Sequence, residues 1–484
     1  MAVKSIKKNY AFNLLQQILS LLTPLITIPY VSRVLGAEGI GIYSYTNSIV
    51  FYFTLFAALG TATYGQREIS YVQDNREKRS EVFWNTEIRC IITTTICLFA
   101  YIFFVLIQEQ NKIIYTILAL SIVEVSLNIT WAFAGMEDFE KIVKRNIVVK
   151  ILSIAFIFIF VKSKDDLALY VLGMTLAMTV GYLSLWPVLP KIVDRPQWKK
   201  IKPFKDFKVV LSLFIPTIAI SIYTVLDKTM IGIITGNAEE NGFYDQAIKV
   251  SKMALTFVTA LGVVMVPRIG FLFEKKDAEQ IRMYMYRSYR FVWLLGIPLY
   301  MGIVGTAVNF VPWFFGTGFD RVVPILCVLS FLILAIGVNN VTGVQYLIPT
   351  KRQNTFTKTV LFGAAVNFLL NLLLIPNYGA IGAAVASISA ESAIAAIQLV
   401  IVRKELSFIN IIKQSVKYVI AGSLMLIALL FENRYLQPSV PNTILLVATG
   451  CFVYTVMLIV LRDHFFLKNA TSVFSKIMLK LKRK

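Results

Sequence analysis

Charged residues are scarce in this chain, and histidine is almost absent. Asp, Glu, Lys and Arg make up 15% of the 484 residues, whereas a soluble domain carries about 25%. The apolar residues, 57% of the chain, come in long blocks, and many blocks exceed the roughly 18 residues that indicate a membrane-spanning helix. This scarcity of charge excludes an ordinary soluble domain and predicts an all-α, multi-pass integral membrane protein.

Cysteine is also rare. Cys90, Cys97, Cys327 and Cys451 are scattered through apolar segments, and no pair has the spacing of metal ligands or of a disulfide framework. We expect them to be small buried hydrophobic residues. The single histidine, His464, follows the last apolar block, which favours a solvated tail residue over a catalyst. The sequence therefore predicts no bound cofactor.

Fourteen apolar segments are long enough to span a membrane, although the fifth and thirteenth are short. Their approximate ranges are 10–32, 40–64, 83–107, 113–135, 146–162, 167–189, 209–234, 243–267, 288–310, 321–343, 355–375, 380–402, 414–431 and 442–461. An even number of spans places both termini on the same side of the membrane.

Lys and Arg are distributed unevenly over the connections. The N-terminus, the C-terminal tail and alternate connections, with their adjoining helix ends, hold 39 of the 48 Lys and Arg residues, and the opposite set holds six. By the positive-inside rule both termini are cytoplasmic. The net charge of +21 is therefore explained by topology and by the anionic inner leaflet, and we expect membrane lipids rather than nucleic acid as partners.

An internal repeat divides the chain. "LSLLTP" at Leu19–Pro24 matches "LSLFIP" at Leu211–Pro216, and the spacing from Gly41 to Arg67 equals that from Gly242 to Arg268. Six spans separate the copies, so both have the same orientation, which predicts two six-helix lobes related by a pseudo-two-fold axis along the membrane normal. Transporters of this plan bind substrate between lobes and alternate access to it.

The predicted domains follow from this repeat. They are an N-terminal lobe (1–190), a basic cytoplasmic linker (191–208), a C-terminal lobe (209–403) and two added helices with a basic tail (404–484).

Three cations remain inside predicted spans: Lys228, Lys249 and Lys252. In the eighth span Asp245, Lys249 and Lys252 continue into Thr256 and Thr259 at helical spacing, which predicts one polar face. Asp245 and Lys249 are at i, i+4 and can pair. The alternative is that the lysines extend outward to the membrane surface.

Asp227 and Lys228 are neighbours in the seventh span. Adjacent residues project about 100° apart on a helix, so each needs a partner on another helix or in water. Extension to the surface is again the alternative for Lys228, whereas the shorter Asp227 extends less easily.

Other ionisable and amide residues lie deep in predicted spans, where such groups face a cavity or pair across helices. They are Glu124 and Asn128 in the fourth span, Asn367 and Asn371 in the eleventh, and Ser387 and Glu391 in the twelfth. Interhelical hydrogen bonding is the simplest interpretation. The sharper hypothesis is a Na⁺ site with oxygen ligands from Asp227, Asn367, Asn371 and Ser387, or proton coupling through Asp227 or Glu391.

Several motifs resemble one known family. "YVSRVLGAEGIGIYSYTNSIVFYFTLFAALG" with "YGQREIS", "LDKTMIG" with "GFYDQAIKV", and "NLLLIPNYGAIGAAVASISAE" are similar to segments of Wzx-type polysaccharide flippases of the multidrug/oligosaccharidyl-lipid/polysaccharide (MOP) superfamily. The resemblance covers nearly the whole chain.

This resemblance implies transport of an undecaprenyl-diphosphate-linked oligosaccharide from the cytoplasmic to the outer leaflet of a bacterial plasma membrane, for capsule or O-antigen synthesis. A polysaccharide polymerase would be a partner. Lys249, Lys252, Lys228 and Arg33 are then candidates for contact with the diphosphate, where lysine acts as a point charge.

Three alternatives remain open. A flippase for the peptidoglycan precursor would have the same fold. A multidrug antiporter would favour an acidic cavity, whereas this chain has three intramembrane lysines. An enzyme, such as a polymerase or glycosyltransferase, would need a sizeable outer loop; every predicted outer loop is short and no nucleotide-binding motif occurs, so we expect no enzymatic activity.

Overall fold

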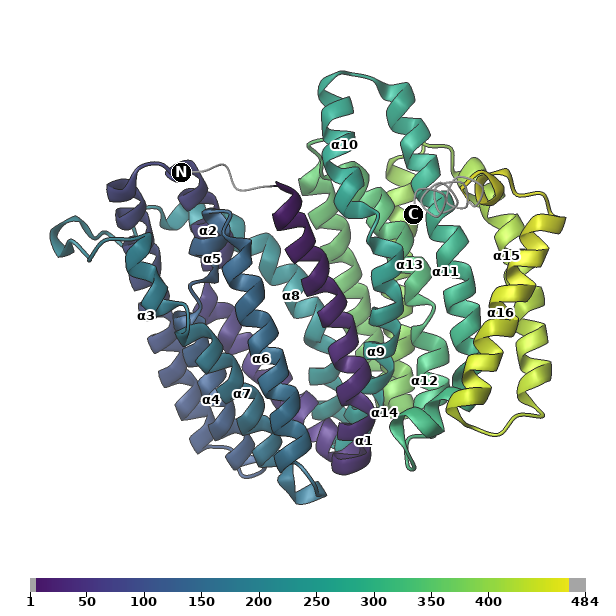
Figure 1. Ribbon diagram of the computed structural model, residues 1–484, viewed down its shortest axis with the longest axis horizontal. Coiled ribbons are helices and arrows are strands. Elements are labelled where there is room, and N and C mark those ends of the chain that lie inside the picture. Colours follow the sequence, from purple (N-terminus) through teal and green to yellow (C-terminus); the bar gives the residue numbers. More distant parts are fainter. Residues whose placement is uncertain (1–5, 470–484) are drawn as a thin grey trace, which may run out of the picture. The chain divides into compact units, whose positions relative to one another are not determined.

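The computed structural model describes residues 6–469; for residues 6–18, 20, 21, 216, 219, 220 and 222 only the backbone is described. Throughout this part of the chain the regular elements are helices and none is a strand (Figure 1). Ten helical stretches within it are long and apolar enough to cross a membrane. The prediction of an all-α, multi-pass membrane protein is confirmed.

All fourteen predicted spans coincide with helical segments. The helices are α1 (Ile6–Ala58), α2 (Thr61–Tyr71), α3 (Arg76–Leu106), α4 (Lys112–Leu127), α5 (Thr130–Gly135), α6 (Phe139–Phe160), α7 (Leu167–Leu183), α8 (Phe207–Thr235), α9 (Ala238–Thr259), α10 (Gly262–Glu274), α11 (Ala278–Phe315), α12 (Val322–Leu329), α13 (Leu332–Asn339), α14 (Gln353–Ile401), α15 (Phe408–Asn433) and α16 (Val440–Val460). Short 3₁₀ turns η1 (Lys164–Asp166), η2 (Trp186–Lys191) and η3 (Trp198–Lys200) and a π-helix η4 (Asn340–Leu347) complete the set.

Single glycines separate two pairs of predicted spans. The first and second spans are joined in α1 at a kink whose centre is Gly36, with φ 69°. The eleventh and twelfth spans are joined in α14 at Gly379, with φ 55°. Positive φ is readily available only to glycine, which explains why the chain changes direction there without a loop.

Several predicted spans are interrupted rather than continuous, the fourth and the tenth among them. The fourth span ends as α4 at Leu127 and resumes as α5, because Asn128 has non-helical dihedrals and its Oδ1 accepts hydrogen bonds from the Thr130 backbone and hydroxyl. Asn128 therefore does not continue the helix that carries Glu124, although the sequence places both residues in one span. The tenth span passes from α13 into the π-helix η4, and π-helical turns are frequent at functional sites.

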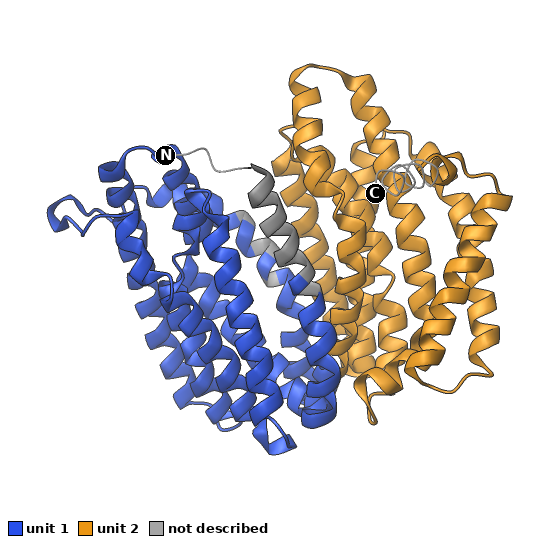
Figure 2. Ribbon diagram, viewed as in Figure 1, with its two compact units in different colours: residues 1–242 blue, residues 243–484 orange. Residues whose placement is uncertain are grey.

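The chain divides into two compact units, residues 1–242 and 243–484 (Figure 2). In unit 1, α8 packs against α1 and α2. In unit 2, α15 and α16 pack against α11, with Ile297, Tyr418 and Leu446 in a shared buried cluster. The two C-terminal helices are thus an integral part of unit 2. The boundaries of the predicted repeat lobes remain a prediction.

The segment predicted as a linker is bound along the start of α3. Asp194 donates its backbone N–H to Ser80 Oγ (2.9 Å) and accepts from Arg76 Nε (2.7 Å). The buried Arg79 donates to the Ile192 carbonyl (2.7 Å). These bonds make residues 191–194 a structural part of unit 1.

Candidate functional site

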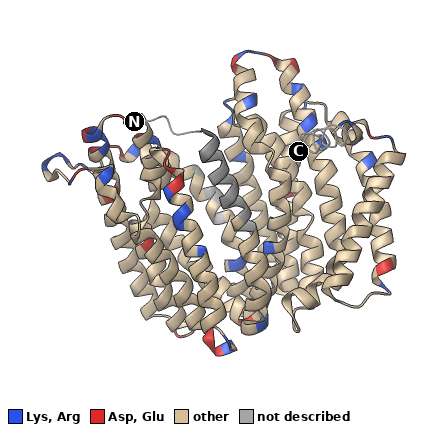
Figure 3. Ribbon diagram, viewed as in Figure 1, with Lys and Arg blue, Asp and Glu red and all other residues tan. Residues whose placement is uncertain are grey.

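Long stretches of helix in both units carry few charges (Figure 3). The candidate functional groups are the few charged and polar side chains inside those stretches. They form separate groups, which are described first for unit 1 and then for unit 2.

Asp227 lies on α8 among hydroxyl groups. Its side chain is buried, with 8% of the residue exposed, and Lys228 is half-buried. The neighbouring Thr229 donates to Ser48 Oγ (3.0 Å) and is hydrogen-bonded to Tyr52 Oη (2.9 Å), both on α1. The Tyr52 hydroxyl is within electrostatic reach of the Asp227 carboxylate. α8 therefore presents Asp227 next to a polar seam shared with α1.

Sequence reasoning missed this seam because hydroxyl groups in a helix usually bond to their own backbone. Ser48 and Thr229 also make such bonds, to Tyr45 O and Val225 O. The only signal was the position of Thr229 beside the Asp-Lys pair.

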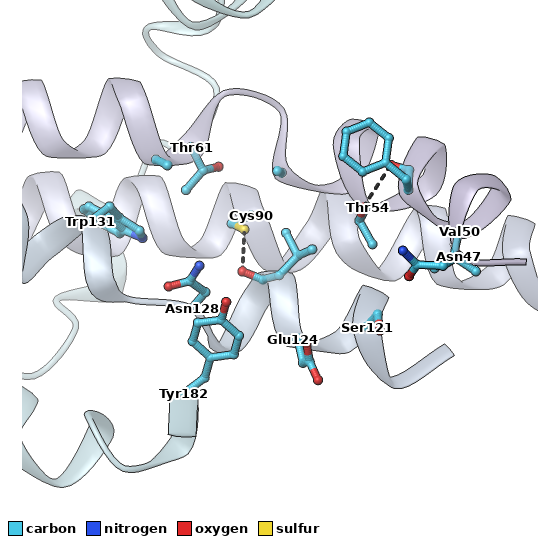
Figure 4. A pocket seen from close by; sticks show the side chains of 14 residues that line it. Asn47, Val50, Thr54, Thr61, Cys90, Ser121, Glu124, Asn128, Trp131 and Tyr182 are labelled. Atoms are coloured by element: carbon cyan, nitrogen blue, oxygen red, sulfur yellow. Dashed lines mark hydrogen bonds between the residues drawn. The ribbon is translucent and has the colours of Figure 1, made fainter. Parts of the chain in front are cut away.

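Unit 1 also holds a cavity of about 280 Å³ (Figure 4). Its lining residues are Asn47, Val50, Phe51, Thr54 and Ala58 of α1, Thr61 and Ala62 of α2, Cys90 of α3, Ser121, Glu124 and Val125 of α4, Asn128, Trp131 of α5 and Tyr182 of α7. Both predicted polar residues of the fourth span thus face one cavity despite the break between them.

Glu124 is half-buried in that cavity and accepts a hydrogen bond from Thr179 Oγ1 of α7 (2.9 Å). Arg145 of α6 lies over the ring of Tyr182, 4.1 Å from its centroid. The cavity can therefore hold water beside a carboxylate, and the Thr179 bond matches the interhelical hydrogen bonding expected for Glu124.

Glu87 on α3 is a buried acid that sequence reasoning did not single out. The residue is 1% exposed, and neither carboxylate oxygen has a hydrogen-bond partner among residues 6–469. Two residues on, Arg89 is also buried and lies 4.7 Å from the centre of the Tyr64 ring. Their apolar neighbours Phe83 and Cys90 were the available signal of burial.

The predicted pair on α9 forms in unit 2. Lys249 Nζ lies 2.5 Å from Asp245 Oδ2, and the Asp245 side chain is almost fully buried while that of Lys249 is 40% exposed. Lys252, one turn further, is exposed. The pair anchors Lys249 near a carboxylate and leaves part of its side chain open to the surroundings.

The predicted polar residues of α14 are hydrogen-bonded. Asn371 Nδ2 donates to Asn367 Oδ1 (3.2 Å), and both residues are fully buried. On the other side of the Gly379 kink, Ser387 Oγ is 3.3 Å from Tyr244 Oη of α9. Amide and hydroxyl oxygens therefore line both halves of α14 inside the protein.

Glu391 binds a different helix. Asn339 Nδ2 of α13 donates to its carboxylate and to its backbone carbonyl (3.2 Å for the carbonyl). Asn339 directly precedes the π-helix η4. The arrangement matches the interhelical hydrogen bonding expected for this residue.

The predicted cation ligands are divided between the units. Asp227 belongs to unit 1, whereas Asn367, Asn371 and Ser387 belong to unit 2. The predicted diphosphate contacts are divided too, because Lys228 and the exposed Arg33 lie in unit 1 and the α9 lysines in unit 2. Both sites remain predictions.

The chain has a multi-pass helical fold that matches solved transporter structures. The chain superimposes on the lipid II flippase MurJ in an inward closed conformation with a TM-score of 0.75 and 16% identity, covering 94% of this chain and 99% of that one. An inward-facing multidrug resistance MATE family transporter of the MOP superfamily gives a TM-score of 0.59 and 11% identity, covering 84% and 98%. At these identities the likeness establishes the fold alone.

The chain belongs to the polysaccharide biosynthesis protein family, whose model matches residues 6–273. A relative from Escherichia coli (strain K12), named "Putative O-antigen transporter", is 25% identical over 410 residues, covering 82% of this chain and 97% of that protein. The resemblance found in the sequence motifs is confirmed.

Proposed function

We propose that the protein is an alternating-access flippase that moves undecaprenyl-diphosphate-linked oligosaccharide units from the cytoplasmic to the outer leaflet. The observation that carries this proposal is the match along almost the whole length of the E. coli O-antigen transporter relative, joined to a fold shared with a lipid flippase. The activity is transport rather than catalysis, and the glycan would enter capsule or O-antigen synthesis.

The substrate explains the distribution of polar groups. Its diphosphate and sugars need a hydrated, cationic path, while its lipid stays in the bilayer. Lys249, Lys252, Lys228 and Arg33 are the proposed diphosphate contacts, because an ammonium group on a flexible stem binds phosphate as a point charge. Asp245 holds Lys249 in place.

Ion coupling is proposed for the acids and amides. Asp227, Asn367, Asn371 and Ser387 offer the hard oxygen ligands that suit Na⁺, and Asp227 or Glu391 could carry a proton instead. In proteoliposomes we expect a sodium gradient to change the flipping rate of the parent but not of Asp227→Asn. Equal rates with and without the gradient in the parent would remove sodium coupling.

We further propose that the protein lies in a bacterial plasma membrane with both termini in the cytoplasm, as the distribution of Lys and Arg indicates. A polymerase acting on the exported units would be its functional partner. A cysteine placed near either terminus should then react with a membrane-permeant thiol reagent only.

The diphosphate role is tested by Lys249→Ala combined with Lys252→Ala. Surface polysaccharide should disappear while the protein still inserts into the membrane at the parental level, and Lys404→Ala, an exposed lysine on a connection, should leave export unchanged. A normal amount of surface polysaccharide in the double variant would show that Lys249 and Lys252 are not needed to bind the diphosphate.

A peptidoglycan-precursor flippase is the second candidate, and the TM-score of 0.75 with MurJ favours it. Genetic complementation of two strains distinguishes the two candidate functions. Rescue of a strain depleted of its lipid II flippase would support this candidate, whereas rescue of an O-antigen transporter deletion alone supports the first.

A further inference from the structure

Unit 2 contains a second pocket, of about 350 Å³, away from the groups described above. Its walls come from α11, α15 and the segment after α16 (Figure 1). The lining residues are Arg290, Asn410, Lys413, Gln414, Lys417, Asp463, His464 and Phe465. The pocket thus joins the two C-terminal helices, which lie outside the predicted repeat, to the rest of the unit.

Cations dominate this pocket. Arg290, Lys413 and Lys417 form no ion pair with any acid of residues 6–469. The buried acid, Asp463, already accepts from the Tyr418 hydroxyl (3.2 Å) and from the Phe466 backbone N–H (2.7 Å). The three cations outnumber the single carboxylate of Asp463, so the pocket has a net positive charge.

The pocket is also held in shape without a ligand. Lys417 Nζ donates to the carbonyls of Leu461 (2.8 Å) and Arg462 (3.2 Å), which fixes α15 against the end of α16. Asn410 lies in the first turn of α15, where the helix dipole favours an anion. The charges therefore need little reorganisation to receive one.

Gln414 adds a second requirement for the ligand of this pocket, a hydrogen-bond donor. Its Oε1 is buried and has no hydrogen-bond partner among the described residues. A buried acceptor of this kind destabilises the protein unless a donor reaches it. An occupant of the pocket should therefore carry both a negative charge and a hydroxyl donor.

An apolar stripe on α15 borders the lysines. Ile412, Val416 and Ile420 are exposed at i, i+4 and i+8, each next to or close to Lys413 and Lys417 in the sequence. On a membrane-spanning helix such a stripe faces acyl chains. Charge in the pocket and apolar surface beside it match the two halves of a phospholipid.

We propose that this pocket binds the headgroup of an anionic phospholipid, phosphatidylglycerol, with its phosphate against Arg290, Lys413 and Lys417. A glycerol hydroxyl donates to Gln414 Oε1, and the acyl chains lie along the α15 stripe. Basic pockets between helices on the cytoplasmic side are suited to such headgroups. A zwitterionic lipid would add a cation to an already positive site. The proposal does not depend on the transported substrate.

Native mass spectrometry of the full-length protein in detergent tests this directly. Phosphatidylglycerol should bind with one saturable site and more tightly than phosphatidylethanolamine. Arg290→Gln with Lys413→Gln should weaken it by about thirtyfold, since each of the two cations contributes about 1 kcal/mol and every 1.4 kcal/mol is tenfold in affinity. Lys404→Gln, exposed and only nine residues before Lys413, is the matched control and should bind as the parent does.

Three results would overturn the proposal: equal phosphatidylglycerol binding in the double variant and the parent, equal binding of the two phospholipids, or stronger binding of undecaprenyl phosphate that the double variant loses. Lys413→Gln alone is a control for misfolding of the double variant. Because Lys413 is exposed and makes no hydrogen bond that would be lost, this variant should keep the parental melting temperature while still weakening the lipid.

Discussion

Gly41 of α1 and Gly242 of α9 lie against each other within unit 1. A Cβ atom on Gly41 would fall 2.9 Å from the Gly242 nitrogen and 1.6 Å from the Ala238 carbonyl oxygen. The two glycines occupy the same position in the two copies of the predicted sequence repeat. Helix backbones approach this closely only where both residues are small, so this crossing requires a small residue at both positions.

Gly41→Ala should therefore be strongly destabilising. The new methyl group meets backbone atoms, which cannot rotate away, so we expect a loss of about 1–3 kcal/mol and a lower melting temperature in detergent. Gly302→Ala is the control, because its Cβ would meet only Met425 Cε at 3.9 Å and alanine favours the helix. A melting temperature of Gly41→Ala at or above that of the parent would contradict the close crossing.

The Asp245–Lys249 pair predicts a coupled response. Lys249→Gln removes the cation beside a buried carboxylate, so it should lower the melting temperature more than Lys252→Gln, whose side chain is exposed. Adding Asp245→Asn should recover part of the loss, with a coupling energy of about 0.5–1 kcal/mol for a pair that is partly open to solvent. Strict additivity of the two changes would show that the pair does not contribute to stability.

Thr229 should matter for the attachment of α8 to α1. Thr229→Val removes the hydroxyl that bonds Ser48 and Tyr52, at a cost of about 1–2 kcal/mol. Thr224→Val serves for comparison, since that exposed hydroxyl bonds only the Ser221 carbonyl of its own helix. Thr229→Val should have the lower melting temperature of the two variants. Equal melting temperatures would show that the contact of Thr229 with Ser48 and Tyr52 does not stabilise the protein.

A cluster outside the spans predicts pH-dependent stability. Burial raises the pKa of Glu405, but hydrogen bonds from Arg352 (3.0 and 2.8 Å) and Tyr346 (2.5 Å) lower it more, and the resulting pKa lies below its ordinary value. The carboxylate therefore stabilises the protein above the unfolded pKa of about 4.3, and this contribution is lost as the pH falls through the folded value.

Glu405→Gln should thus melt below the parent at pH 7, with a gap that closes at about pH 3. Glu274→Gln provides the control, because its ion pair with Lys351 is largely exposed and should contribute little. A gap that stays constant with pH would mean that Glu405 acts through packing rather than through its charge.

The sequence predicted the helices well because apolar run length alone decides what can span a bilayer. It also predicted a pair that depends on helical spacing, Asp245 with Lys249. It could not predict contacts made across long sequence distances. Arg79 bonds the Ile192 carbonyl 113 residues away, and nothing in a basic, proline-containing segment indicates that it will pack on α3.

Local breaks were equally hidden. Mean hydropathy does not reveal that α4 ends before Asn128, because a single amide changes the mean of a window very little, although its Oδ1 bonds the backbone N–H and hydroxyl of Thr130. The change from α- to π-helix after Asn339 cannot be recognised in the amino-acid composition of the segment. Burial of Glu87 was missed for a related reason: its charge near a helix end suggested solvent, and only the packing of α3 places it inside.

The glycine kinks of α1 and α14 have a practical consequence for mapping this protein in cells. Because a single residue joins the two helices at each kink, an epitope or protease site inserted at Gly36 or Gly379 would disturb the packing of both helices. Reporter insertions should instead go between α15 and α16, where residues 434–439 offer a non-helical connection. The surface available to antibodies, phages and proteases on that side is correspondingly small.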